Sequence, residues 1–511
     1  MPQKADNALR ILFKSGTILF VGLFVELAIS FVAKLVIARV LGPVNYGAVS
    51  LGITTATIVS TVVLLGLNTG IGRYLPTFSD DARRRGVLVS AFQVGVPLSL
   101  LASLLIVVFA PTIARVVFTD PATAPVLRIF ALAIPLAAVM KLAVGSVQGL
   151  KLSLPKVYIQ NISLPTLRFV GILAVLSIGF GATGVAWAYV FSYLGAATLG
   201  VYFLYTRTTL FDRTSRYEPM HSDLLLFSAP LVVSTVMTFV FADMDTFMLG
   251  YFSSTGDVGV YNTIYPIALL LTTMLSSFGF IFMPVIAELY ADGDTESMRT
   301  LYQVVTKWIF TVTVPLFVVV ALFPEQSIRV TFGEQYVSGA LALSVLSVAF
   351  FSHAIAGPNS DALTSLGRTR LIMYDNTLVA AVNFVLNVLL IPRYGVLGAA
   401  VATAVAYVLL NALYSYQLYR ETGIQPFTES LLRLAGSALV LSLIGYVLVT
   451  DQLGGDVVAT GAVSLAVAGG YLLAVLRFGV GPEELVLLDS VESRFGLDLE
   501  RLRAFVTRFS R

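Results

Sequence analysis

Apolar runs of roughly 20 residues follow one another along almost the whole chain, separated by short polar segments. A run of this length crosses the hydrocarbon core of a bilayer when it is helical. The pattern therefore predicts an all-α polytopic membrane protein with about fourteen transmembrane helices. The predicted spans are 17–41, 48–70, 87–110, 126–147, 157–178, 184–205, 224–250, 260–284, 303–323, 339–357, 371–391, 398–417, 430–449 and 456–476.

Two sequence patterns recur at a fixed offset of 214 residues. Arg115-Val-Val-Phe118 returns as Arg329-Val-Thr-Phe332, and a Gly-x-x-Gly-x-Ala-x-Ala pattern at 181–188 returns at 395–402. Spans one to six and seven to twelve therefore form two equivalent six-helix lobes. Six is an even number, so both lobes enter the membrane in the same direction, as parallel repeats around a central cavity. Paired halves of this kind are typical of transporters.

The repeat and the polar segments predict the domain organisation. The lobes are joined by a cytoplasmic loop and followed by two further helices that have no counterpart in the repeat. The predicted divisions are 1–206 for the N-terminal lobe, 207–223 for the loop, 224–425 for the C-terminal lobe, 426–476 for the two extra helices and 477–511 for a cytoplasmic amphipathic tail.

Composition and charge agree with this picture. Hydrophobic residues make up 57% of the chain and charged residues 12%, and the mean hydropathy is +0.88. With the N-terminus placed inside, 24 Lys and Arg residues lie in inner segments and 5 in outer segments, a bias that predicts cytoplasmic termini. Cysteine is absent, which excludes disulfides and thiolate metal sites, and a net charge of +3 does not indicate a nucleic-acid partner.

Signatures of enzymes are sparse. No Gly-Lys pair occurs, so the chain has no phosphate-binding loop of the nucleotide-hydrolysing type. His221 and His353 have no partner at metal-ligand spacing, and both are interpreted as structural. Asp243-Met-Asp245 resembles the metal-binding pair of many glycosyltransferases, but residues two apart on a helix point about 200° away from each other. We therefore predict a protein that is not an enzyme and has no metal site.

Several charged residues lie inside the predicted spans, where each costs about 3 kcal/mol at a helix centre. Glu26 in span one and Arg168 in span five lie too deep to reach an interface easily, and we interpret both as functional. Lys34 and Lys141 can extend to an interface along their aliphatic stems. The positions 214 residues after Glu26 and Arg168 are both valine, so these charges are not part of the repeated scaffold. This supports a functional interpretation of Glu26 and Arg168.

Two acidic residues in span seven are candidates for ion coupling or gating. Asp243 and Asp245 lie in the outer third of that span, where they can pair with Lys34 or Arg39. A buried pair of this kind can hold two parts of a transporter together as a gate. Together with Glu26, these two aspartates are the candidates for ion coupling or gating.

Four motifs, in this order and spacing, resemble the polysaccharide exporter and oligosaccharide-lipid flippase family of the multidrug/oligosaccharidyl-lipid/polysaccharide exporter superfamily. The resemblance covers residues 10 to 425, most of the chain. The motifs are Arg39-Val-Leu-Gly42-Pro43-Val-Asn-Tyr46-Gly47; Asp245-Thr-Phe-Met-Leu-Gly250 with Val258-Gly259-Val-Tyr261; Ala362-Leu-Thr-Ser-Leu-Gly367-Arg-Thr-Arg370; and Asn383-Phe-Val-Leu-Asn387-Val-Leu-Leu-Ile-Pro392-Arg-Tyr-Gly395.

The resemblance implies two lobes with a V-shaped cavity that opens alternately to each side and carries a polyprenyl-linked sugar. Its anionic phosphate head needs a cationic cavity, and guanidinium groups offer forked donors to phosphate oxygens. Arg39 matches the signature arginine, and charge and position add Lys34, Arg73 and Arg168 as substrate-binding candidates. No resident cofactor is expected; proton or sodium coupling would involve the acidic residues.

The leading hypothesis is a flippase that moves a polyprenyl-phosphate- or pyrophosphate-linked oligosaccharide from the inner to the outer leaflet of a prokaryotic plasma membrane. Its expected partners are the lipid-linked substrate, membrane lipids and glycan-assembly enzymes, and we expect a monomer. One alternative is a cation-coupled multidrug exporter of the same superfamily. Another is a membrane-embedded glycan polymerase or glycosyltransferase, although the chain lacks the large extramembrane loop that such enzymes usually carry.

Overall fold

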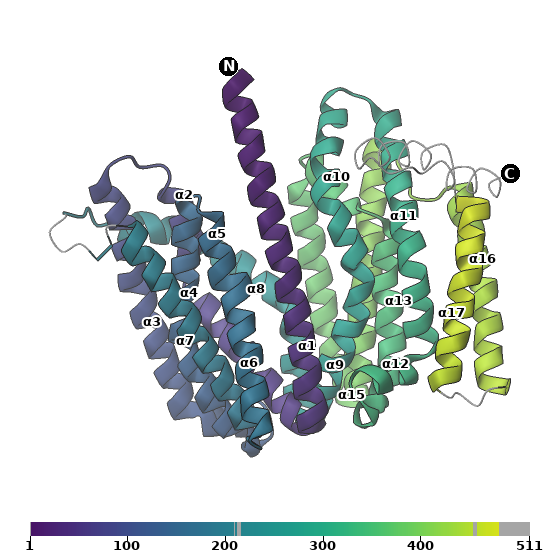
Figure 1. Ribbon diagram of the computed structural model, residues 1–511, viewed down its shortest axis with the longest axis horizontal. Coiled ribbons are helices and arrows are strands. Elements are labelled where there is room, and N and C mark those ends of the chain that lie inside the picture. The colour runs from purple at the N-terminus through teal and green to yellow at the C-terminus, as the bar shows by residue number, and fades with distance from the viewer. Residues whose placement is uncertain (1, 209, 212–215, 453–456, 480–511) are drawn as a thin grey trace. The chain divides into compact units, whose positions relative to one another are not determined.

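The structure is a computed structural model that describes residues 2–208, 210–211, 216–452 and 457–479 (Figure 1). Among these residues every secondary-structure element is an α-, 3₁₀- or π-helix, and no β-strand occurs. The all-α prediction is confirmed. Most of the predicted amphipathic tail, from residue 480 onward, lies outside the described residues.

The chain divides into two compact units, Met1–Thr263 and Ile264–Arg511. The first unit contains eight helices, one 3₁₀ turn, a π-helical stretch and the start of a ninth helix. These are α1 Pro2–Val62, α2 Leu67–Tyr74, α3 Asp81–Val116, η1 Pro121–Thr123, α4 Ala124–Gly149, α5 Ser153–Lys156, η2 Val157–Ser163 (π), α6 Leu164–Ser177, α7 Ala182–Arg207, α8 His221–Phe252 and α9 Thr255–Leu269.

The second unit continues from the end of α9. Its elements are η3 Leu270–Thr272, α10 Thr273–Ala291, α11 Thr295–Leu322, α12 Pro324–Thr331, η4 Glu334–Gly339, α13 Ala340–Ala356, α14 Asn359–Ser365, α15 Thr369–Thr422, α16 Glu429–Val447, η5 Leu448–Gln452 (π), α17 Val457–Ala474 and η6 Val475–Gly479 (π).

Two long helices each hold two predicted spans. The first, α1, changes direction at Gly42, which has φ 75° and precedes Pro43. The second, α15, does so at Gly395, which has φ 51°. Glycine adopts positive φ without the steric cost that a Cβ would bring, so each glycine lets one span follow another almost directly. A further break at residues 63–66 bends α2 by 46° from α1.

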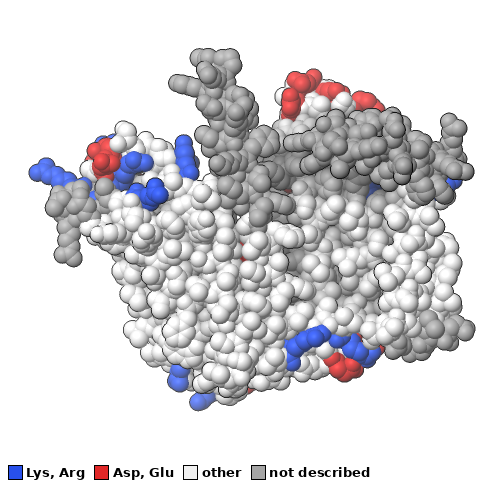
Figure 2. Space-filling view, viewed as in Figure 1, with Lys and Arg blue, Asp and Glu red and all other residues white. Residues whose placement is uncertain are grey.

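Ten helices of the described chain are long and apolar enough to cross a membrane, or eleven when α1 and α2 count as one bent span. The predicted spans fall on helical residues over nearly their whole length. Figure 2 shows Lys, Arg, Asp and Glu gathered near the helix ends, with uncharged side chains along the flanks between them. The protein is a multi-pass membrane protein.

Each unit has its own core. In the first, α4 packs against α1, α2, α3 and α7. In the second, α13 packs against α11 and α15, and α16 and α17 pack against α11. The first unit extends past the predicted lobe end at residue 206 because α8 packs against α1, α2 and α3. The predicted lobe boundaries stay a prediction.

Candidate binding cavity of the first unit

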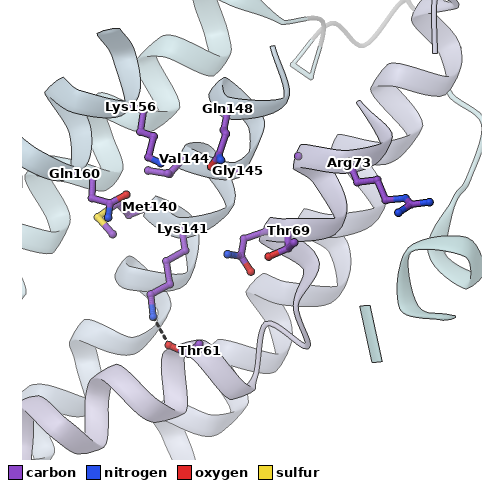
Figure 3. A pocket seen from close by; sticks show the side chains of 12 residues that line it. Thr61, Thr69, Arg73, Met140, Lys141, Val144, Gly145, Gln148, Lys156 and Gln160 are labelled. Carbon is purple, nitrogen blue, oxygen red and sulfur yellow. Dashed lines mark hydrogen bonds between the residues drawn. The ribbon is translucent and has the colours of Figure 1, made fainter. Parts of the chain in front are cut away.

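The first unit contains a cavity of about 500 Å³ between α2, α4 and the α5–η2 segment (Figure 3). Most of its lining residues have polar side chains, three of these side chains are basic, and none is acidic. The lining consists of Thr61, Asn68, Thr69, Gly72, Arg73, Met140, Lys141, Val144, Gly145, Gln148, Lys156 and Gln160.

The break after α1 shapes one wall of this cavity. Leu65 and Gly66 have positive φ values of 49° and 74°, and α2 starts immediately afterwards at Leu67. The first residues of α2 therefore include two polar lining residues, Asn68 and Thr69. Close packing fixes α2 on α4, because a Cβ at Gly145 would lie 2.4 Å from the carbonyl oxygen of Asn68. A short polar helix is thereby held beside the cavity.

Lys141 of α4 is the basic residue whose ammonium group is most firmly positioned. Its Nζ donates hydrogen bonds to Ser60 Oγ at 2.9 Å and to Thr61 Oγ1 at 2.6 Å. Figure 3 shows the bond to Thr61. The aliphatic stem is partly buried, and the two hydroxyl groups replace part of the hydration of the charge. The side chain is thus held within the unit by hydrogen bonds to α1.

The π-helical stretch η2 brings polar side chains to two neighbouring sites. Gln160 lines the cavity, and the adjacent Asn161 donates a hydrogen bond to Glu26 Oε2 at 2.5 Å. Lys156, at the start of this stretch, lines the cavity and also acts electrostatically on Glu26. Single π-helical turns inside α-helices occur often at functional sites. The cavity is therefore linked to the predicted residue Glu26.

Arg73 lies at the rim. It is exposed, and its guanidinium carbon lies 4.6 Å from the centre of the Phe227 ring. In Figure 3 its side chain extends away from Lys141. A cation over an aromatic face is held by the ring quadrupole, so Arg73 adds positive charge at the edge of the cavity rather than in its centre.

Two other predicted basic residues, Lys34 and Arg168, belong to a separate charged cluster. The guanidinium of Arg168 on α6 stacks over Tyr189 and Tyr193 of α7, at 4.2 and 5.3 Å. The charged neighbours of Lys34 are Asp243 and Arg168. Asp243 is thus an acidic neighbour of Lys34, and the pairing of the two residues stays a prediction. None of these side chains lines the cavity, and their roles stay predictions.

The remaining predicted residues lie near the α1 kink and on α8. Asp245 is buried and accepts a hydrogen bond from the Tyr261 hydroxyl of α9 at 2.5 Å. Arg39 is exposed, three residues before Gly42. Within the described part of the chain, no group of three His, Cys, Asp or Glu residues is arranged to hold a metal ion.

Comparison with known proteins decides the family. The family model described as polysaccharide biosynthesis protein matches residues 12–290, more than half of the chain. The chain belongs to this family. The resemblance seen in the motifs is confirmed. A second family model, MatE, matches residues 230–389 of the chain.

The chain is similar in part of its sequence to known proteins, and it is similar in fold to solved structures. The uncharacterized membrane protein MJ1068 of Methanocaldococcus jannaschii is 26% identical over 35% of this chain and 38% of its own. The probable low-salt glycan biosynthesis flippase Agl15 of Haloferax volcanii is 23% identical over 37% of this chain and 40% of its own. The matched regions thus span about two fifths of these relatives. The lipid II flippase MurJ, in an inward closed conformation, shares the fold with a TM-score of 0.70 at 13% identity, over 91% of this chain and 99% of MurJ.

Of the four predicted substrate-binding residues, only Arg73 is among the residues that line this cavity. The sequence places Lys156 between predicted spans four and five and Gln160 within span five, and it predicts that Lys141 reaches an interface. All three line the cavity. One signal was available in the sequence. Three polar residues lie close to the junction of predicted spans four and five, as expected for a water-exposed surface. They are Gln148, Lys156 and Gln160.

Proposed function

We propose that this protein is a flippase that moves a polyprenyl-phosphate- or pyrophosphate-linked oligosaccharide from the inner to the outer leaflet of a prokaryotic plasma membrane. The observation that carries the proposal is the cavity that Lys141, Lys156 and Arg73 line without an acidic residue. A phosphate head is anionic, and its transfer through hydrocarbon without compensation is prohibitively costly. Ammonium and guanidinium groups supply charge-assisted hydrogen bonds to phosphate oxygens.

Chemistry and position support the same substrate. Amide and hydroxyl groups of Asn68, Thr69, Gln148 and Gln160 add donors and acceptors of the kind that bind sugar or phosphate oxygens. By the Lys and Arg bias, the loops next to the cavity face the cytoplasm, where a lipid-linked glycan would be loaded. In this scheme the termini are cytoplasmic, the protein acts as a monomer beside glycan-assembly enzymes, and no covalent step takes place.

Reconstituted transport tests the proposal. Purified protein in liposomes is supplied with fluorescent polyprenyl-pyrophosphate-linked glycan in one leaflet, and its appearance in the other leaflet is measured. We expect flipping by the wild type, and strong loss in Lys141→Met and Lys156→Met. Lys151→Met is the matched control, because Lys151 is exposed and does not line the cavity. Absence of flipping for every lipid-linked glycan tried would sink the proposal.

The MatE match favours one second candidate, a cation-coupled multidrug exporter. Cationic drugs would need acidic groups in the cavity, whereas the lining described above is basic. A gene deletion separates the two functions. A flippase mutant loses surface glycan and keeps its drug tolerance, and an exporter mutant shows the reverse.

A further inference from the structure

The second unit contains a cavity of the same size, about 500 Å³, between α10, α13 and α14. Its charged lining differs from that of the first cavity, because it contains one carboxylate and one imidazole and no Lys or Arg. The lining residues on which the argument depends are Gly279 of α10, His353 of α13 and Asp361 of α14.

The two cavities occupy equivalent positions in the internal repeat. Four lining residues of the second cavity follow four lining residues of the first by the 214-residue offset. The pairs are Thr61 and Leu275, Thr69 and Met283, Val144 and Pro358, and Gly145 and Asn359.

The charges do not follow the repeat. Lys141 corresponds to Ile355, and both His353 and Asp361 correspond to valines in the first half. One repeat thus has a basic cavity, and the other has a cavity with an acid and a titratable base.

Hydrogen bonds fix how His353 presents its ring. Asn411 donates its amide Nδ2–H to the Tyr407 carbonyl at 2.8 Å, so its Oδ1 is left as an acceptor. That oxygen lies 2.7 Å from His353 Nδ1, which therefore carries the hydrogen in the neutral ring. The lone pair of His353 then sits on Nε2, which is the atom able to take up a proton.

Asp361 supplies the opposite charge. Its Oδ2 lies against α10 so closely that a Cβ at Gly279 would come within 2.5 Å of it. Gly279 therefore leaves the space that this carboxylate occupies. The charged neighbour of His353 is Asp361, and the charged neighbour of Asp361 is His353.

The surrounding helices add few other ionisable groups. From α15, the Tyr407 ring lies edge-on to the imidazole, with ring centres 6.0 Å apart. From α11, Tyr302 is buried and bonded to the Ala356 carbonyl, and Lys307 is also buried. The α10 residues of the lining are uncharged.

We propose that the second cavity is a proton-binding site, in which His353 Nε2 takes the proton and Asp361 is its counter-charge, and that this proton drives transport. Nε2 takes the proton from the aqueous phase and returns it there, so no other reactant is consumed. The transport part rests on the proposed function, and proton binding itself can be measured without it.

Histidine NMR tests proton binding directly. The chain has two histidines, so full-length protein labelled with ¹⁵N-histidine gives two sets of imidazole signals, and His221→Gln identifies the set that belongs to His353. We expect the His353 signal to change from neutral to protonated as the pH falls. Asp361→Asn, which preserves side-chain shape, should move this transition to lower pH by about one unit. A signal that does not titrate, or that Asp361→Asn leaves unchanged, would overturn the proposal.

Transport with ion gradients tests the coupling. Flipping is measured in liposomes with and without a pH gradient, and separately with a sodium gradient. We expect the pH gradient to accelerate flipping by the wild type and by His221→Gln. In Asp361→Asn, the rate with the gradient should equal the rate without it. Acceleration by sodium alone would contradict the proton assignment. Absence of any flipping would count against the flippase, while the NMR titration would still decide the proton site.

Discussion

Gly259 lies against the carbonyl oxygen of Pro43, so closely that a Cβ at residue 259 would come within 2.0 Å of that oxygen. The contact is reciprocal, because a Cβ at Gly47 would lie 1.8 Å from the carbonyl oxygen of Thr255. Two motifs more than 200 residues apart, at 39–47 and 258–261, are therefore two sides of one backbone contact. This gives a structural reason for glycine at both positions.

Gly259→Ala should destabilise the protein. The added methyl group must push two backbones apart, and overpacking of this kind costs about 1–3 kcal/mol or more. Thermal unfolding of the purified protein measures the effect. Gly436→Ala is the matched control, because nothing lies within 4 Å of a Cβ at that position. Equal melting temperatures for Gly259→Ala and the wild type would contradict the contact.

Lys141→Met should weaken binding of the lipid-linked phosphate. The substitution preserves length and removes the ammonium group that Ser60 and Thr61 position beside the cavity. A hydrogen bond to a charged group contributes about 1.5–3 kcal/mol, so the dissociation constant should rise about tenfold or more. Titration with a soluble polyprenyl-phosphate analogue measures this change. Affinity equal to that of Lys151→Met would count against a cavity role for Lys141.

Arg168→Ala should reduce flipping while the protein stays folded and inserted. The loss of stacking on Tyr189 and Tyr193 costs about 0.5–2 kcal/mol, which a protein of this size can tolerate. Flux in liposomes and thermal unfolding, measured on the same preparation, separate the two effects. Loss of the protein from the membrane would show that Arg168 has a structural role.

Glu26→Gln should also reduce flipping. The amide can still accept the hydrogen bond from Asn161, so the local contact survives and the negative charge facing Arg168 and Lys156 is lost. Flux should therefore fall without a large change in melting temperature. Unchanged flux would remove Glu26 from the coupling or gating candidates.

The start of α11 should be sensitive to acid. Asp294 caps this helix, and hydrogen bonds from Ser297 hold the pKa of Asp294 below its usual value. A lowered pKa means that the cap contributes stability above the unfolded-state pKa and loses it as pH falls through the folded-state pKa. Amide exchange in the first turn of α11, corrected for intrinsic rates, should thus rise in acid. In Asp294→Asn this pH dependence should disappear.

Much of the fold could be predicted because spanning length is a local property. An apolar run of about 20 residues has to become a helix wherever it enters a bilayer, whatever it packs against. The repeat motifs and the motif at 39–47 were readable for a similar reason, since they mark helix ends and glycine contacts. The sequence does not predict the break at 63–66, because an apolar Leu-Leu-Gly-Leu stretch does not differ from a continuous span in hydropathy.

The sequence alone indicates that Glu26 and Arg168 need polar or charged partners, because a charge in the hydrocarbon core is costly. Packing decided which partners they have. Arg168 faces two tyrosines of α7, Glu26 meets Asn161, and Lys141 and Lys156 converge on a cavity that no single helix forms. Length and hydropathy are summed along a segment, whereas a binding cavity depends on the close approach of separate helices. The spans were therefore fixed by local chemistry, and the site was fixed by helix packing.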